Sequence, residues 1–314
     1  MFFLDMRHIY CLLCNMPVAV NQCVNIPFPF NIKLTIKRED LLHPHISGNK
    51  FRKLKYNILQ AQKEGKHTLL TFGGAFSNHI AATAAAGKEY GFATIGVIRG
   101  EELGDKIVNN PTLVFAQECG MRLKFVSRDD YRLKAEDGFM ERLHAEFGDF
   151  YSVPEGGTNI LAVKGCEEIL DERDAVFTHI ACAVGTGGTV SGIINSAKPH
   201  QKILGFPVLK ADLSNDVKRF AKTKNWELFA DYHFGGYAKV NGQLVAFIND
   251  FFEKTGVPLD PVYTGKAVFG VIDLIGKGYF PENSDILFIH TGGLQGITGM
   301  NNELSRKGLP IIKT

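Results

Sequence analysis

Cysteine is scarce in this chain, and the few that occur do not form a disulfide framework. The 314 residues contain six cysteines, too few and too scattered for a disulfide scaffold in a chain of this length. Cys11 and Cys14 form a CxxC pair, but no second CxxC and no preceding βαβ pattern accompany it. We therefore expect a reducing compartment, and neither a metal nor a redox site at this pair.

Long apolar runs and long runs of one charge are also missing. No stretch of about 18 apolar residues is present to span a bilayer, and Asp5, Arg7 and His8 interrupt the apolar start of the chain. We therefore expect no signal peptide and a cytoplasmic location. The formal charge of +2 is spread along the sequence, which argues against nucleic acid or a membrane as partner and favours a small-molecule substrate.

The common nucleotide and metal motifs are absent. The stretch at 270–279, GVIDLIGKGY, is nearest to a P-loop, but it has an extra residue before Gly-Lys and glycine after the lysine. Val190 stands where the third glycine of a dinucleotide fingerprint belongs. His43, His45 and His179 lack metal-ligand partners at plausible spacing, so we interpret them as structural or exposed.

Short β-rich runs alternate with longer helical patterns. Predicted strands span residues 31–37, 67–72, 93–98, 122–126, 176–184, 202–206 and 285–290, and predicted helices include 50–64, 78–90, 133–147 and 189–197. This alternation predicts an α/β fold with mostly parallel sheets. In such sheets ligands bind at the carboxyl ends of the strands.

The first strand end that carries candidate functional residues is that of the predicted strand 176–184. The loop Gly185, Thr186, Gly187, Gly188 and Thr189 comes next, and a helix begins near residue 190. Glycines allow close backbone approach, and the N–H groups of such a loop and helix start can hold a phosphate. A plain glycine-rich turn is the alternative, but strand, loop and helix are in register for a phosphate of mononucleotide size.

The second strand end follows residues 67–72. Gly73 and Gly74 lead into Ser77, Asn78 and His79, which open an alanine-rich helix. Ser77 is a good N-cap, which is one interpretation. The other is that the helix N-terminus and the serine hydroxyl bind a substrate carboxylate.

Lys50 stands at a turn-to-helix junction, directly after Ser47-Gly48-Asn49. A lysine placed there can point into a cleft, and its amine becomes a nucleophile where burial or cations such as Arg52 and Lys53 lower its pKa. By itself Lys50 could be an ordinary helix-start lysine. Combined with a small-phosphate loop and an anion-binding helix start, it suggests a Schiff base with pyridoxal phosphate.

At these residues the chain resembles the pyridoxal-phosphate enzymes of the tryptophan-synthase β fold type, within them the D-cysteine desulfhydrases and 1-aminocyclopropane-1-carboxylate deaminases. The resemblance covers residues 33–300 in order and rests on five segments: SGNKFRKLKY, SNH, VGTGGTVSG, VYTGK and IHTGG. It implies two α/β domains with the cofactor cleft between them, residues 1–50 and 151–314 forming the large one and 51–150 a smaller insertion. A homodimer is usual among such enzymes.

Carried over by position, the resemblance makes Lys50 the Schiff-base lysine and proton-transfer base. Lys53, with the loop 185–189, would hold the phosphate. Asn78 would bond the phenolic oxygen of the cofactor, and Thr291 would lie against its pyridine nitrogen.

The resemblance also implies the substrate site. Ser77, Asn78 and His79 would meet the substrate, Tyr263 would stack near it and assist proton transfer, and Thr264 would lie beside it.

Departures from the family pattern bear on the substrate. Deaminases of the cyclopropane substrate have Glu and Leu where this chain has Thr264 and Thr291, and a neutral hydroxyl at the pyridine nitrogen favours β-elimination. The first expectation is therefore a D-cysteine desulfhydrase, and the deaminase is the alternative. Phe76, Ala81 and Ala82 replace Gln, Arg and Gln, which predicts a more apolar pocket.

Two other classes stay open. A carrier or sensor that binds pyridoxal phosphate without turnover would not need the carboxylate site. A nicotinamide oxidoreductase is disfavoured because the third glycine is missing and the next predicted strand, which ends at Phe206-Pro207, carries no acid for a ribose. Lys266, after "YTG", could be a second catalytic amine, but we expect a solvated or phosphate-facing lysine.

Overall fold

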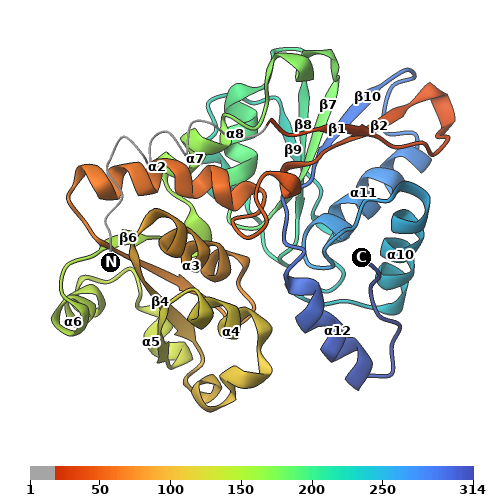
Figure 1. Cartoon of the computed structure of the whole chain (residues 1–314). Coiled ribbons are helices and arrows are strands. Elements are labelled where there is room, and N and C mark those ends of the chain that lie inside the picture. Colours follow the sequence, from red (N-terminus) through yellow and green to blue (C-terminus); the bar gives the residue numbers. More distant parts are fainter. Residues whose placement is uncertain (1–17) are drawn as a thin grey trace.

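The computed structural model describes residues 18–314, so the Cys11–Cys14 pair and the start of the chain lie outside the described residues. Two β-sheets lie side by side, each flanked by helices (Figure 1). Both are mostly parallel, which confirms the expected α/β class. Within residues 18–314 none of the helices has the length and apolarity that crossing a bilayer requires.

The larger sheet has six strands in the order β1-β2-β10-β7-β8-β9. These are β1 (Asn21–Cys23), β2 (Lys33–Lys37), β7 (His179–Val184), β8 (Lys202–Pro207), β9 (Trp226–Leu228) and β10 (Asp285–Ile289). Only β1 pairs antiparallel with its neighbour. Strand β7 is shorter than expected because Asp171 and Asp174 form a capping box that turns residues 172–176 into a 3-10 helix.

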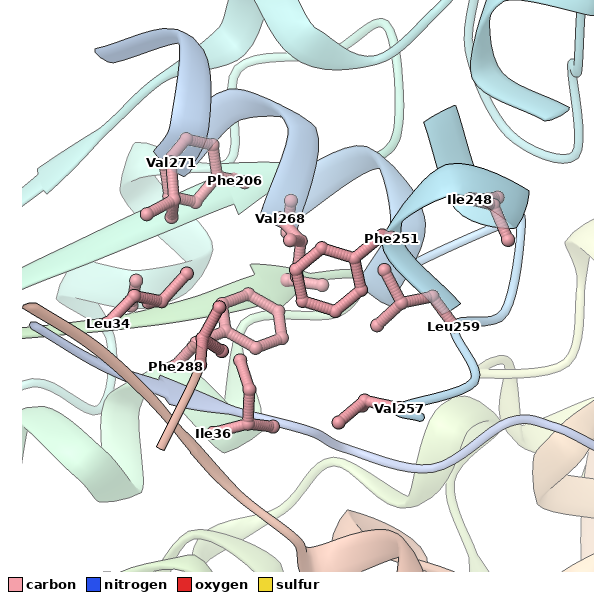
Figure 2. Close-up of a cluster of buried hydrophobic side chains, with 14 of the residues drawn as sticks. Leu34, Ile36, Phe206, Ile248, Phe251, Val257, Leu259, Val268, Val271 and Phe288 are labelled. Carbon is pink, nitrogen blue, oxygen red and sulfur yellow. The ribbon is translucent and has the colours of Figure 1, made fainter. Parts of the chain in front are cut away.

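The strands of this sheet are buried on both faces. Along β10, Ile286 and Phe288 join the cluster under helices α10 (Gly242–Thr255) and α11 (Thr264–Gly276), whereas Leu287 and Ile289 pack against the opposite cluster. Figure 2 shows the first cluster, where Phe288 lies near Phe251. Burial on both sides explains why these strands appear in the sequence as continuous apolar runs.

The smaller sheet has four parallel strands in the order β5-β4-β3-β6. They are β3 (Thr68–Gly73), β4 (Ala93–Arg99), β5 (Arg122–Val126) and β6 (Tyr151–Val153). Leu69 of β3 faces the helices α2 (Asn49–Lys63) and α3 (Asn78–Tyr90), and Leu70 and Phe72 face the opposite cluster. Strand β6 pairs with β3, so the sheet extends slightly beyond residue 150.

Helices cover both sheets. They are α2 (Asn49–Lys63), α3 (Asn78–Tyr90), α4 (Pro111–Glu118), α5 (Arg128–Arg132), α6 (Asp137–Phe147), α7 (Ile160–Cys166), α8 (Gly188–Ser196), α9 (Ser214–Lys218), α10 (Gly242–Thr255), α11 (Thr264–Gly276) and α12 (Gly296–Arg306). Short 3-10 helices are η1 (Pro29–Asn31), η2 (Glu39–Leu41), η3 (Glu101–Asn109), η4 (Glu155–Gly157), η5 (Glu172–Val176) and η6 (Ala230–Tyr232).

Local capping sets where the helices begin and end. Helix α3 matches the predicted range because the Ser77 hydroxyl accepts from the N–H of Ile80 and Gly91 adopts a left-handed φ of 77°. The helix predicted over 133–147 is present as α6 and ends as expected at Phe147, but it begins only at Asp137. Ser127 caps the earlier helix α5, and the chain turns before α6 begins at Asp137.

Candidate active site

A cleft lies where the two sheets meet. It brings together nine of the predicted site residues: Lys50, Lys53, Asn78, Gly185, Thr186, Gly187, Thr189, Tyr263 and Thr291. Four others do not line it, namely Ser77, His79, Gly188 and Thr264. The cleft also takes in Asn49 and Gly156, which the sequence analysis did not single out.

The turn before Lys50 is bonded to two other strand ends. Gly48 has φ 61°, and a Cβ there would lie 2.1 Å from the carbonyl oxygen of Thr291, so only glycine fits. The N–H of Asn49 donates to that same oxygen at 3.2 Å, and its side-chain amide donates to the hydroxyl of Thr189 at 2.8 Å. Lys50 therefore has a fixed position between the loops that follow β7 and β10.

The amine of Lys50 is available for chemistry. Burial and, to a smaller extent, the nearby Lys53 lower its pKa to about 7, although Cys166 and Asp260 partly oppose the shift. Among the described residues the amine has no hydrogen-bond or ion-pair partner. A desolvated lysine with this pKa is substantially neutral near pH 7, which is the nucleophilic form.

The two cations after Lys50 have different environments. Arg52 forms a buried, two-pronged pair with Glu39, with N–O distances of 2.8 and 2.9 Å, and so serves the structure. Lys53 faces the cleft and donates to the carbonyl of Gly156 and the hydroxyl of Thr158, both at 2.9 Å. Burial lowers the pKa of Lys53.

The loop after β7 has the features of an anion cradle. The N–H groups of Gly185, Thr186 and Gly187 donate to no backbone carbonyl within the described residues. Helix α8 then starts at Gly188, after Gly187 in a left-handed conformation with φ 80°. The first N–H groups of a helix lack intrahelical acceptors, so loop and helix together offer several donors beside the ammonium of Lys53.

The start of α3 forms another side of the cleft. Ser77 accepts a hydrogen bond through its oxygen from the N–H of Ile80 at 3.3 Å, which leaves its own proton free to donate. Asn78 lines the cleft, and a Cβ on Gly293 would lie 2.9 Å from its side-chain nitrogen. Asn78 therefore lies against the segment that follows β10.

His79 points into the protein rather than into the cleft. It is 2% exposed, and its Nε2 lies 2.8 Å from the hydroxyl of Thr71, which itself donates to the carbonyl of Val153. Burial, with Lys50 and Lys53 nearby, holds the pKa of His79 well below its usual value, so the ring is neutral. Any effect of His79 on a substrate is indirect, through the position of α3.

Tyr263 and Thr264 are both fixed by Asp260, a residue that the sequence analysis did not identify. The buried carboxylate of Asp260 accepts from the N–H groups of Tyr263 and Thr264 at 2.9 and 2.7 Å, and from the Thr264 hydroxyl at 2.8 Å. Thr264 thus faces Asp260, behind the cleft. Tyr263 lines the cleft, and burial raises its phenolic pKa well above the ordinary value.

Three further residues join the site or its surroundings. Thr158 lies 2.5 Å from Thr186, hydroxyl to hydroxyl, beside Lys53. Tyr237 packs against Tyr263 with ring centroids 6.1 Å apart. Lys266 is not solvated, contrary to expectation, because it is 1% exposed; it does not line the cleft, and its amine donates to the carbonyls of His233 and Gly236.

This donor set fits pyridoxal phosphate. An unpartnered amine of lowered pKa can bind an aldehyde carbon. Beside it stand the free N–H groups and threonine hydroxyls that a phosphate requires. Neither a P-loop lysine nor a group of metal-ligating side chains is found in residues 18–314.

The chain is similar to known proteins over most of its length. It is 33% identical over 296 residues, 87% of this chain and 88% of the other, to a Pyrococcus horikoshii protein provisionally named a 1-aminocyclopropane-1-carboxylate deaminase. It is 32% identical to the mitochondrial bifunctional D-cysteine desulfhydrase/1-aminocyclopropane-1-carboxylate deaminase of Arabidopsis thaliana, over 91% of this chain and 78% of that protein.

The fold agrees with a solved structure. The crystal structure of a homologue of 1-aminocyclopropane-1-carboxylate deaminase superposes with a TM-score of 0.79 at 30% identity, covering 95% of this chain and 98% of that one. The family model described as "Pyridoxal-phosphate dependent enzyme" matches residues 19–292. The chain therefore belongs to the family of pyridoxal-phosphate dependent enzymes.

Proposed function

We propose that this chain is a lyase acting on a small amino acid, with D-cysteine as first candidate substrate; β-elimination of sulfide would leave aminoacrylate, which water hydrolyses to pyruvate and ammonia. One observation carries the proposal: the partnerless amine of Lys50, with a pKa of about 7, shares a cleft with an anion-binding loop and with the start of α3. An amine, a phosphate cradle and a carboxylate site are the three requirements of this chemistry.

The cofactor would be held by residues of several strand ends. Lys50 would bind it covalently, Lys53 and the loop 185–189 would hold its phosphate, Asn78 would bond its phenolic oxygen, and Thr291 would lie against its ring nitrogen. When bound, pyridoxal phosphate supplies an electron sink for the charge left on the substrate α carbon.

The chain's own groups would bind the substrate and move its protons. The Ser77 hydroxyl and the first N–H groups of α3 would hold the substrate carboxylate. Lys50, whose pKa is close to neutrality, can both take and return a proton at the α carbon. Tyr263, a neutral phenol, can donate to the leaving group.

The choice of D-cysteine rests on Thr291. Its neutral side chain lines the cleft and does not stabilise a protonated ring nitrogen as a carboxylate would, which favours elimination over chemistry that needs a stronger electron sink. Thr264 gives no such support because its hydroxyl is bonded to Asp260. The bifunctional plant relative makes the cyclopropane amino acid the second candidate.

Keto-acid formation tests the proposal. The cofactor-loaded protein is mixed separately with D-cysteine, L-cysteine and 1-aminocyclopropane-1-carboxylate, with Lys50→Ala as blank. We expect pyruvate and sulfide from D-cysteine. Release of 2-oxobutanoate from the cyclopropane substrate alone would transfer the assignment to the deaminase, and inactivity on all three would favour a carrier or sensor.

The proposal includes the organisation of the chain. The four-stranded sheet and its helices, about residues 51–150, would form the small domain, and residues 1–50 and 151–314 the large one. We also propose a homodimer in the cytoplasm. The mass in solution from light scattering tests the dimer, and cell fractionation tests the location.

A further inference from the structure

Lys266 occupies a place where a lysine is unfavourable. It lies in the first turn of α11, which begins at Thr264, and only 1% of it is exposed. The N-terminus of a helix carries partial positive charge, and burial removes the hydration of an ammonium, so both effects oppose a cation there. Burial accordingly lowers the pKa of Lys266 to about 8, and Asp260 partly opposes this shift.

Two backbone carbonyls of a single loop stabilise the buried ammonium of Lys266. The Nζ of Lys266 donates to the carbonyl of His233 at 2.9 Å and to the carbonyl of Gly236 at 2.8 Å. Both acceptors belong to the segment between η6 and α10. A single buried ammonium therefore ties this segment to the first turn of α11.

The segment needs such a tie because of its backbone conformation. Phe234, Gly235, Gly236 and Ala238 have φ values of 51°, 92°, 114° and 54°. Residues with a Cβ adopt this region only at a cost, and they keep it where surrounding contacts hold them. Two carbonyl acceptors on one amine provide that support.

This segment carries Tyr237. Its ring packs edge-on against the ring of Tyr263, at an interplanar angle of 72° and with ring centroids 6.1 Å apart. Tyr263 precedes α11 as its N-cap residue. The turn of helix that places Tyr263 in the cleft therefore also holds, through Lys266, the loop that places Tyr237 against it.

We propose that Lys266 is a positioning residue that holds the loop 233–238 so that the ring of Tyr237 stays packed against the ring of Tyr263. This inference rests on the proposed function for its effect on turnover, but not for the loop contact. Lys266 is not a second catalytic amine, because it does not line the cleft and its amine is bonded to two carbonyls.

The test separates the loop contact from its effect on activity. In the cofactor-loaded protein, hydrogen exchange is measured for wild type, Lys266→Met, Lys266→Gln and the control Lys254→Met, which removes an exposed lysine of α10. We expect Lys266→Met to speed exchange of the amides of Gly236 and Lys239 at least tenfold and to leave β10 unchanged. Lys266→Gln, which keeps two N–H donors, should show a smaller increase.

Steady-state kinetics then tests whether Lys266 affects the active site through Tyr237. We expect Lys266→Met to lower kcat at least tenfold with a smaller change in KM, and to add less than twofold in a Tyr237→Ala background, which lacks the ring that contacts Tyr263. Unchanged loop exchange would overturn the inference even if no substrate is turned over. Multiplicative effects of the two substitutions would overturn the route through Tyr237. If Lys266→Met does not fold, Lys266→Gln is judged by the same two criteria.

Discussion

The backbone N–H of Asn49 donates to the carbonyl oxygen of Thr291 at 3.2 Å, so the turn that presents Lys50 is bonded directly to the segment after β10. The contact depends on Gly48, which has no Cβ to collide with that carbonyl. The positions of the reactive amine and of the residue proposed to face the cofactor ring are thus coupled through the backbone.

Gly48→Ala should abolish cofactor loading. The new Cβ would lie 2.1 Å from a backbone oxygen at a φ of 61°, and backbone cannot move aside as a flexible side chain can. Visible absorbance of the purified protein measures loading, and thermal unfolding measures folding. The control is Gly242→Ala, because Gly242 has nothing within 4 Å of its Cβ position. Normal loading by Gly48→Ala would show that the turn is not rigid.

The pKa of Lys50 predicts how the cofactor-free protein reacts with aldehydes at different pH. Only the neutral amine attacks a carbonyl, and lowering the pKa from 10.5 to about 7 places its formation in the neutral range. The rate of reaction with pyridoxal should rise about tenfold from about pH 6 to about pH 8 and then level off. A rate that keeps rising to about pH 10 would mean an unperturbed lysine.

The pair of Arg52 and Glu39 predicts a non-additive effect on stability. Arg52→Met leaves the buried Glu39 carboxylate without its partner and should cost about 3–5 kcal/mol in the free energy of unfolding. The double variant Arg52→Met/Glu39→Met should lose less than the sum of the two single variants, because no charge stays unpaired. Urea denaturation checks both values, and strict additivity would contradict the assignment.

Ser77 allows capping and substrate binding to be separated. Ser77→Ala should cost about 1 kcal/mol of stability through loss of the N-cap, whereas Ser77→Gly should cost only a few tenths. If the hydroxyl also holds the substrate carboxylate, both variants lose activity by a similar factor. Steady-state kinetics and urea denaturation on the same samples separate the two roles. Full activity in Ser77→Gly would remove Ser77 from the substrate site.

Much of the fold could be predicted because its signals are local. Ser77 and Gly91 mark the two ends of α3, and residues 122–126 form the strand that their β-rich sequence predicts. Strands β1, β6 and β9 have three residues each and are too short for a recognisable period. They form through pairing with neighbours distant in sequence.

The site was predictable where a motif presents a residue directly, as with Lys50 and the loop 185–189. The direction in which a side chain points could not be predicted, because tertiary packing decides it. No sequence pattern predicts that His79 points toward Thr71 or that Lys266 points toward a loop. Asp260 could have been identified from the sequence, because an aspartate shortly before a helix commonly accepts hydrogen bonds from the first N–H groups of that helix.

The contacts of Asn49 also bear on the biosynthesis of the protein. Its partner Thr189 lies 140 positions later in the chain, and Thr291 is more distant still. A growing chain on the ribosome cannot assemble this site until β10 and the segment after it have emerged. Cofactor capture is therefore one of the last events in maturation, and a polypeptide released early would leave the ribosome without it.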